Sequence, residues 1–183
     1  MTMSTRFMTI DEYTHDRDQG RPAELLRGEI VQVHRPYPRH GQICARTIRL
    51  VGDFAESHQL GHVIGNDSGI VTSHHPDTVR GGDVWFVSYR RVAPGPLPHG
   101  YLDAVPDLVF EVKAPTERWS ETLTKIAEYL SIGINVVCVL DPEEEMVRLY
   151  YADQPEVILA GEDPVTFPDQ LPGFKVSAQK FFT

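Results

Sequence analysis

The sequence predicts an α/β fold in which a mixed β-sheet is flanked by helices, within a single domain that spans residues 1–183. Three observations predict it. Apolar residues recur with the period of a helix in residues 43–54 and 123–130. Residues 107–113 and 134–140 are rich in strand-forming residues, and the predicted elements alternate along the chain. A chain of 183 residues with 41% hydrophobic content has material for one core of ordinary size.

The N-terminal part of the chain predicts a short helix followed by a hairpin. Thr9 and Glu12 have the spacing of a capping box, so we expect a helix from about residue 10 to a turn near Gly20. Residues 24–26 and 29–33 are β-prone runs on either side of Arg27-Gly28. A two-residue turn that contains glycine typically joins such runs into a hairpin.

A long helix is predicted to follow residues 35–39, a loop whose prolines cannot donate hydrogen bonds to a ladder. The apolar positions of this helix recur on one stripe, made by Ile43, Thr47, Leu50, Val51 and Phe54. We expect Gly61 to end the helix in the left-handed conformation.

The rest of the chain predicts strands around one further helix. From residue 62 to 71 and from 83 to 89, short β-prone runs alternate with turn residues such as those at 66–69, and Gly81-Gly82 is predicted to form a turn before residue 83. A loop over residues 92–100 leads to the strand at 107–113. The next helix is expected to bury one face and to stop at Gly133, before a central strand at 134–140 and an outer strand at 146–151; the buried face would comprise Leu123, Ile126, Ala127 and Leu130.

The strand at residues 107–113 carries the most informative polar residues. Side chains alternate between the two faces of a strand, so Asp107, Glu111 and Lys113 share one face. Asp83 lies on another predicted strand and could approach Glu111 from there. Two carboxylates and one ammonium would then converge, with Asp107 as a substitute if Asp83 does not reach the cluster.

Such a cluster suits the hydrolysis of a phosphodiester bond. Mg²⁺ prefers oxygen ligands, commonly one or two carboxylates, so Asp83 and Glu111 are sufficient protein ligands. The cation would polarise the phosphoryl group and lower the pKa of a water. Lys113 would position that water and counter the charge that develops in the transition state.

Other patterns in the sequence give little support for a different kind of functional site. His58 and His62 have the spacing of zinc ligands on a helix, but Gly61 between them is expected to end the helix. No phosphate-binding loop, dinucleotide fingerprint or serine-hydrolase motif is present in the sequence. Cys44 and Cys138 sit in apolar segments, which is typical of buried thiols in a protein of the reducing cytoplasm.

The order of these segments resembles the Uma-type restriction-endonuclease-like proteins, a bacterial group within the PD-(D/E)XK nuclease superfamily. The resemblance covers most of the chain and rests on residues 24–29, His40 ahead of a helix, residues 83–87 and 106–112, Lys125 with Tyr129, and Asp141-Pro142. Two positions depart from the family pattern. Gly82 replaces the usual proline, and Lys113 restores the Glu-x-Lys pattern of the superfamily.

The resemblance implies a restriction-endonuclease-like core with an N-terminal helix and hairpin. It implies that Asp83 and Glu111 bind the metal and that Lys113 is the catalytic lysine, with Lys125 as its rival. Glu24 would be the additional acidic residue, and His40 and Arg39 are candidate phosphate contacts. The expected cofactor is Mg²⁺, with Mn²⁺ as a substitute, and superfamily nucleases that cut both strands often act as homodimers.

The negative net charge of the chain argues against a nucleic-acid substrate. The formal charge is −9, although 15 of the 26 acidic residues lie in residues 92–183. The arginines and histidine between residues 35 and 49 form a basic cluster, which is also typical of a solvated helix face. Two hypotheses therefore stand: a Mg²⁺-dependent DNA endonuclease, or a non-catalytic oligomeric or adaptor protein on a nuclease-like scaffold.

Overall fold

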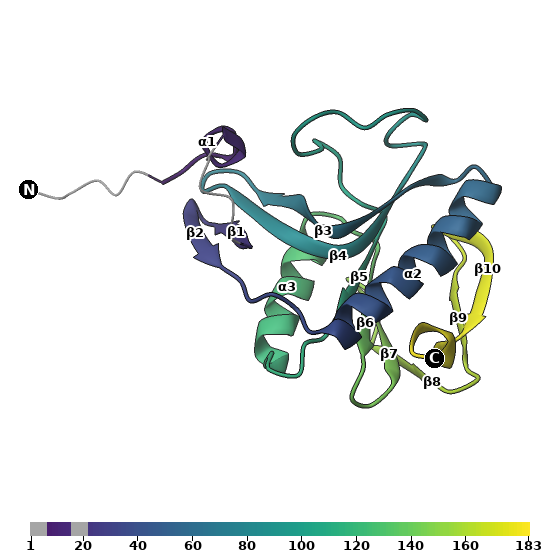
Figure 1. The fold of residues 1–183 in the computed structure, drawn as a ribbon. Coiled ribbons are helices and arrows are strands. Elements are labelled where there is room, and N and C mark those ends of the chain that lie inside the picture. The colour runs from purple at the N-terminus through teal and green to yellow at the C-terminus, as the bar shows by residue number, and fades with distance from the viewer. Residues whose placement is uncertain (1–6, 16–21) are drawn as a thin grey trace, which may run out of the picture.

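The computed structural model describes residues 7–15 and 22–183, and its elements form a large mixed sheet with helices on both faces (Figure 1). The elements up to the centre of the chain are α1 (Ile10–His15), β1 (Ala23–Leu26), β2 (Glu29–Gln32), α2 (Pro38–Ser57), β3 (Gly61–Ser73), β4 (Thr78–Ser88) and β5 (Leu108–Val112). They are followed by α3 (Trp119–Ser131), β6 (Val136–Asp141), β7 (Met146–Tyr150), β8 (Val157–Ala160), β9 (Pro164–Phe167), β10 (Leu171–Ser177) and the 3₁₀ helix η1 (Ala178–Phe181).

The main sheet has the strand order β2-β1-β4-β5-β6-β7-β8, and β3 pairs with β4 away from this path. Strands β5 and β6 run parallel, and α3 connects them. The other pairings in the sheet are antiparallel. The predicted mixed sheet flanked by helices is therefore confirmed.

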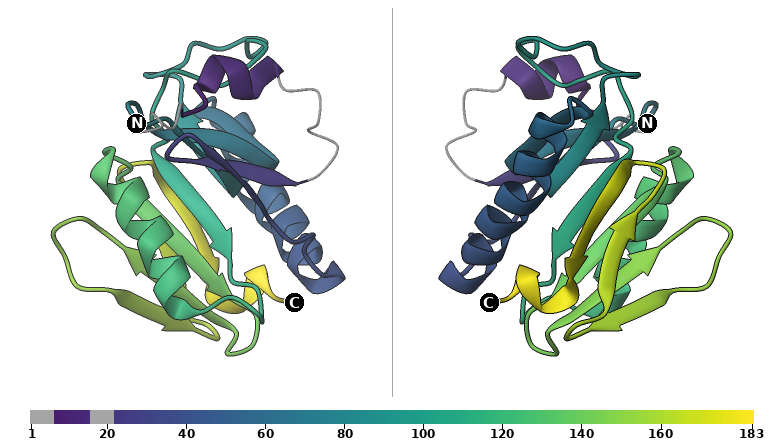
Figure 2. Two further views of the ribbon diagram at one scale, coloured as in Figure 1. Left: turned by 90° about the vertical axis from the view of Figure 1, so that its left-hand side faces the viewer. Right: turned by 90° about the vertical axis from the view of Figure 1, so that its right-hand side faces the viewer.

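Two apolar layers hold the helices against the sheet. On one face, α2 packs together with the β9–β10 hairpin and η1, and their core includes Ile43, Phe110 and Phe167. On the other face, Ile126 and Tyr129 of α3 pack against strand residues of β4, β5 and β6. Figure 2 shows the sheet between these two layers. Strands β5 and β6 are fully buried because both of their faces are covered.

Several sequence predictions hold at the level of single residues. Arg27 and Gly28 have φ values of 51° and 78°, the two positive angles of the tight turn predicted between β1 and β2. The stripe predicted for α2 is buried at Ile43, Thr47 and Val51. His58 and His62 share no helix face, because α2 ends at Ser57 and His62 lies in β3. The predicted end of the first helix near Gly20 lies outside the described residues.

Other predicted boundaries were wrong for identifiable reasons. Helix α2 begins at Pro38, since proline is well suited to the first turn, where its missing N–H is not needed. The left-handed residue after α2 is Gln59, with φ of 52°, and Gly61 begins β3. Gly81 and Gly82 are not a turn but lie inside β4, at positions where neighbouring side chains occupy the space that a Cβ would need.

The buried face of α3 and the position of β7 in the sheet also differ from the prediction. Leu123 is 47% exposed and Ala127 is also exposed, whereas Ile126 is buried as predicted, together with Thr122 and Tyr129. The helix is thus rotated so that Lys125 turns toward the sheet, where carboxylates attract it. Strand β7 is not the outer strand, because β8 pairs with it. The sequence analysis did not anticipate β8, β9, β10 or η1, whose short runs lie between turns.

Candidate active site

The candidate site lies where β4 and β5 diverge. Strand β4 pairs with β5 only as far as Val84 opposite Phe110, and its earlier part pairs with β1 at Val79. Asp83 and Glu111 are the next residues beyond this last pair on their respective strands. The sheet therefore opens between them, and side chains from both layers can enter.

Asp83 is fixed by the backbone of β5. Its Oδ2 accepts a hydrogen bond of 2.7 Å from the N–H of Val112. That N–H lies beyond the paired part of β4, so the carboxylate satisfies a donor that the ladder leaves free. This contact confirms that Asp83 reaches the strand that carries Glu111, as the sequence analysis expected.

Glu111 is buried and held by two groups from α3. Its Oε2 lies 2.7 Å from Nζ of Lys125, and its Oε1 accepts a hydrogen bond of 2.9 Å from the hydroxyl of Tyr129. Burial and the nearby charge of Asp83 raise the pKa of Glu111 to about 8, against the opposing effect of Lys125. Removal of this carboxyl group from water is the main cause, so a further cation beside Glu111 would favour its ionised form.

Lys125 supplies the ammonium closest to Glu111. The ammonium also lies 3.9 Å from Oε1 of Glu24. Burial lowers the pKa of Lys125, but Glu111, Asp83 and Glu24 together raise it above its ordinary value. The lysine is therefore a permanent cation at neutral pH.

Lys113 lies on the same side of the sheet as Glu111 but interacts elsewhere. Its Nζ is 5.4 Å from the centroid of the Trp119 ring and 4.0 Å from Oε2 of Glu143. The face predicted for Lys113 is correct, since Trp119 begins α3. Its ammonium nevertheless lies beside Trp119 and Glu143, and Lys125 is the lysine that pairs with Glu111.

Glu24 is buried in β1 rather than exposed on the hairpin. Its Oε1 accepts a hydrogen bond of 2.9 Å from the N–H of Gly81, and its Oε2 lies 2.8 Å from Nη1 of Arg80. Arg80 also binds Glu128 of α3, with distances of 2.7 and 2.8 Å. Burial lowers the pKa of Arg80, but its two carboxylate partners raise it above the ordinary value. This ion-pair network joins β1, β4 and α3 beside the site.

His40 approaches Asp83 from the first turn of α2. Its Nε2 lies 3.2 Å from Oδ2 of Asp83, and its Nδ1 lies 3.4 Å from Sγ of Cys44. Burial lowers the pKa of His40, but hydrogen bonding and proximity to Asp83 raise it above its ordinary value. Donor atoms of His40, Cys44 and Asp83 lie within 4.8 Å of one another, so this group could hold a softer cation than Mg²⁺.

Arg39 and Asp107 lie outside the cluster. Arg39 is solvent-exposed and contacts Gln42 at 3.1 Å and Glu145 at 3.4 Å. Asp107, the proposed substitute ligand, accepts hydrogen bonds from the N–H of Ser88 at 2.7 Å and from Arg91 at 2.9 Å. Its carboxylate fixes the opposite end of the β4–β5 ladder, while Asp83 takes the position beside Glu111.

Asp67 is a further acidic residue near the site that the sequence did not predict as a site residue. It lies in an irregularity of β3, where Asn66 and Asp67 have φ values of 66° and 57°. A Cβ at Gly81 would collide with its Oδ1, so the carboxylate packs directly over β4. Burial raises the pKa of Asp67, and Lys125, Asp83 and Glu24 are close enough to affect it.

Some of the site residues that were not predicted have a recognisable pattern in the sequence, and others have none. The turn-like run at 66–69 could have marked a bulge that aims Asp67 into the site. Tyr129 follows Lys125 by one helical turn, a spacing that places both side chains on one flank of α3. For Arg80 and Cys44 the sequence offered no comparable signal.

Comparison with known proteins agrees with this architecture. Residues 10–179 match the model of the Uma2 family, which is described as "Putative restriction endonuclease". A crystal structure of a "putative nuclease belonging to DUF820" from Anabaena variabilis has a TM-score of 0.82, with 18% identity over 96% of this chain and 97% of that one. No curated protein matches, and no helix among the described residues is long and apolar enough to cross a membrane. Since the family model covers nearly the whole chain, the protein belongs to the Uma2 family of restriction-endonuclease-like proteins.

Proposed function

We propose that the protein is a divalent-metal-dependent endonuclease that hydrolyses phosphodiester bonds of DNA. Membership of the Uma2 family supports a nuclease in general terms. The observation that carries the finer proposal is the arrangement at the divergence of β4 and β5. There, the Glu111 carboxylate is 2.7 Å from Lys125, and Asp83 is fixed next to it by a backbone N–H.

The residues at this point fit a hard divalent cation. Asp83 and Glu111 offer carboxylate oxygens, the ligand type that Mg²⁺ and Mn²⁺ share. Burial raises the pKa of Glu111 to about 8, so its ionised form is costly even beside Lys125. A cation bound to both carboxylates would stabilise their ionised forms, and when bound it would polarise the phosphoryl group and activate a water.

The protein's own residues have separable roles in this scheme. Lys125 presents a fixed positive charge at Glu111, where it can stabilise the charge that develops on the phosphoryl oxygens. Tyr129 orients the Glu111 carboxylate by donating to the oxygen that Lys125 does not bind. His40, within 3.2 Å of Asp83, restrains that carboxylate and lies where it could donate to a phosphate oxygen. Glu24 adds negative charge near Lys125 and ties the site to β1.

Metal binding gives the first test. Titration of Mn²⁺ by calorimetry should show a site that Glu111→Ala and Asp83→Ala each weaken at least about tenfold. Asp107→Asn is the matched control, since this carboxylate belongs to the same strand region but binds Ser88 and Arg91. Equal affinity in wild type and Glu111→Ala would disprove this metal site.

Cleavage gives the second test. Supercoiled plasmid with Mg²⁺ should be nicked by wild type, while Glu111→Ala should show no cleavage above background. The same assay with a single-stranded RNA substrate distinguishes the two nucleic acids. Absence of nicking by wild type with either Mg²⁺ or Mn²⁺ would favour the non-catalytic scaffold. A homodimer stays a prediction, which light scattering of the purified chain tests.

A further inference from the structure

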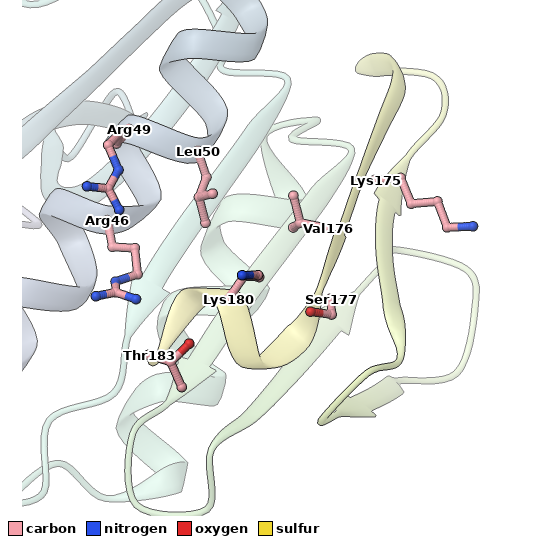
Figure 3. Close-up of a pocket in the computed structure, with 8 residues that line it drawn as sticks. All are labelled: Arg46, Arg49, Leu50, Lys175, Val176, Ser177, Lys180 and Thr183. Atoms are coloured by element: carbon pink, nitrogen blue, oxygen red, sulfur yellow. The ribbon is translucent and has the colours of Figure 1, made fainter.

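A second cluster of cationic residues lines a pocket between α2 and the C-terminal elements (Figure 3). Arg46 and Arg49 come from α2, Lys175 from β10 and Lys180 from η1; Leu50, Val176, Ser177 and Thr183 complete the lining. We call this group of eight residues the C-terminal basic pocket. Figure 3 shows Arg46, Arg49 and Lys180 gathered at one end of it, while Lys175 extends away from them.

The charge of this pocket is not neutralised locally. No acidic residue lines it, and no carboxylate of the described residues lies within ion-pair distance of its four cations. Elsewhere, Arg80, Arg91 and Arg148 each lie within 3.0 Å of a carboxylate oxygen. In a chain with a net charge of −9, unpaired cations from distant segments form a local positive region that attracts anions.

Helix α2 connects this pocket to the candidate active site. His40, in the first turn of α2, contacts Asp83, and the neighbouring Arg39 is solvent-exposed. Arg39 and Arg46 are seven residues apart and therefore lie on one flank of the helix, about 10 Å apart along its axis. A duplex rises about 3.4 Å per base pair along its axis, so this span corresponds to about three base pairs of a duplex that runs parallel to α2.

We propose that the C-terminal basic pocket binds the phosphate backbone of DNA a few nucleotides away from the cleaved bond. This inference rests on the proposed function, since it places the substrate relative to that site. Arginine forks and a lysine ammonium suit phosphate oxygens, and the Ser177 hydroxyl adds a neutral donor. Contacts of this kind position a duplex without reading its sequence.

Binding without cleavage tests the pocket separately from the chemistry. The assay is fluorescence anisotropy of a short labelled duplex in EDTA, with salt varied between about 50 and 200 mM. The variant Arg46→Gln/Lys180→Gln removes two phosphate contacts. Its plot of log K against log salt should be shallower by about 2, and its affinity near 0.1 M salt should fall on the order of 50-fold.

The matched control is Arg27→Gln/Arg90→Gln, which removes the same charge from two exposed arginines outside the pocket. The slope of log K against log salt should change less than half as much in this control as in the pocket variant. Equal slopes for the two double variants would overturn the pocket and leave the nuclease proposal intact. The same conclusion would follow if the pocket variant lost binding to phosphatidylglycerol vesicles but kept binding to the duplex. Absence of duplex binding by wild type would overturn the pocket, while the nicking assay with Mg²⁺ decides the nuclease proposal separately. Retained duplex binding by Asp83→Ala, with no nicking, would separate the pocket from the chemistry.

Discussion

Replacement of Lys125 with methionine removes the ammonium beside Glu111 and keeps a side chain of similar length. The same replacement at Lys113 is the matched comparison, because this buried lysine also lies on the α3 side of the sheet. We expect Lys125→Met to lower the rate of plasmid nicking about 100- to 1000-fold, and Lys113→Met to lower it less than about tenfold.

The difference follows from the two environments. At 2.7 Å and an effective dielectric constant near 20, the attraction between Lys125 and the ionised form of Glu111 is about 6 kcal/mol before desolvation is counted. At 4.0 Å, with Glu143 57% exposed and the dielectric constant near that of water, the attraction between Lys113 and Glu143 is about 1 kcal/mol. Loss of one group that stabilises transition-state charge typically costs about 2.7–4 kcal/mol in the barrier.

The assay compares initial nicking rates in Mg²⁺ at equal protein concentration, with thermal unfolding measured in parallel. Lys125→Arg is the informative third variant, because it restores the charge without restoring the geometry. If Lys113→Met loses as much activity as Lys125→Met while both proteins remain folded, the assignment of the catalytic lysine from the Glu111 contact is refuted.

Three further predictions concern the framework of the site. Arg80→Met should lower the free energy of urea unfolding by about 3–5 kcal/mol, because it leaves Glu24 buried without its cation; a loss below about 1 kcal/mol would contradict a buried pair. Gly81→Ala should destabilise by about 1–3 kcal/mol through its collision with Asp67, and Asp67→Ala should relieve part of this loss in a double-mutant cycle; additive losses would contradict the contact. Burial raises the pKa of Asp77, but hydrogen bonds from two backbone N–H groups lower it overall, so its contribution to stability is present above about pH 4 and disappears as the pH falls through its folded pKa. Unfolding of Asp77→Asn and wild type should therefore differ at pH 7 and converge near pH 2, and a difference that grows in acid would reverse the sign of this argument.

The sequence determined the elements that carry the site because their patterns are local. Alternation along residues 107–113 placed Glu111 and Lys113 on one side, and the structure has both on the side of α3. The turn at Arg27-Gly28, the buried face of α2 and the central strand β6 followed from turn chemistry and apolar period in the same way. The sequence also predicted that Asp83 could approach Glu111, although the contact of Asp83 with Val112 depends on where the β4–β5 ladder ends.

Only the tertiary structure decided which charges meet. The rotation of α3 exposes Leu123 and brings Lys125 to Glu111, fourteen positions earlier in the chain. Likewise, Arg80 binds Glu24 across 56 positions, and Lys180 joins Arg46 in one pocket. The physical reason is that periodicity fixes which face of an element a side chain occupies, whereas docking of helix on sheet fixes the distance between faces. Ion pairs depend on that distance, and so the lysine that pairs with Glu111 could not be predicted before the elements were assembled.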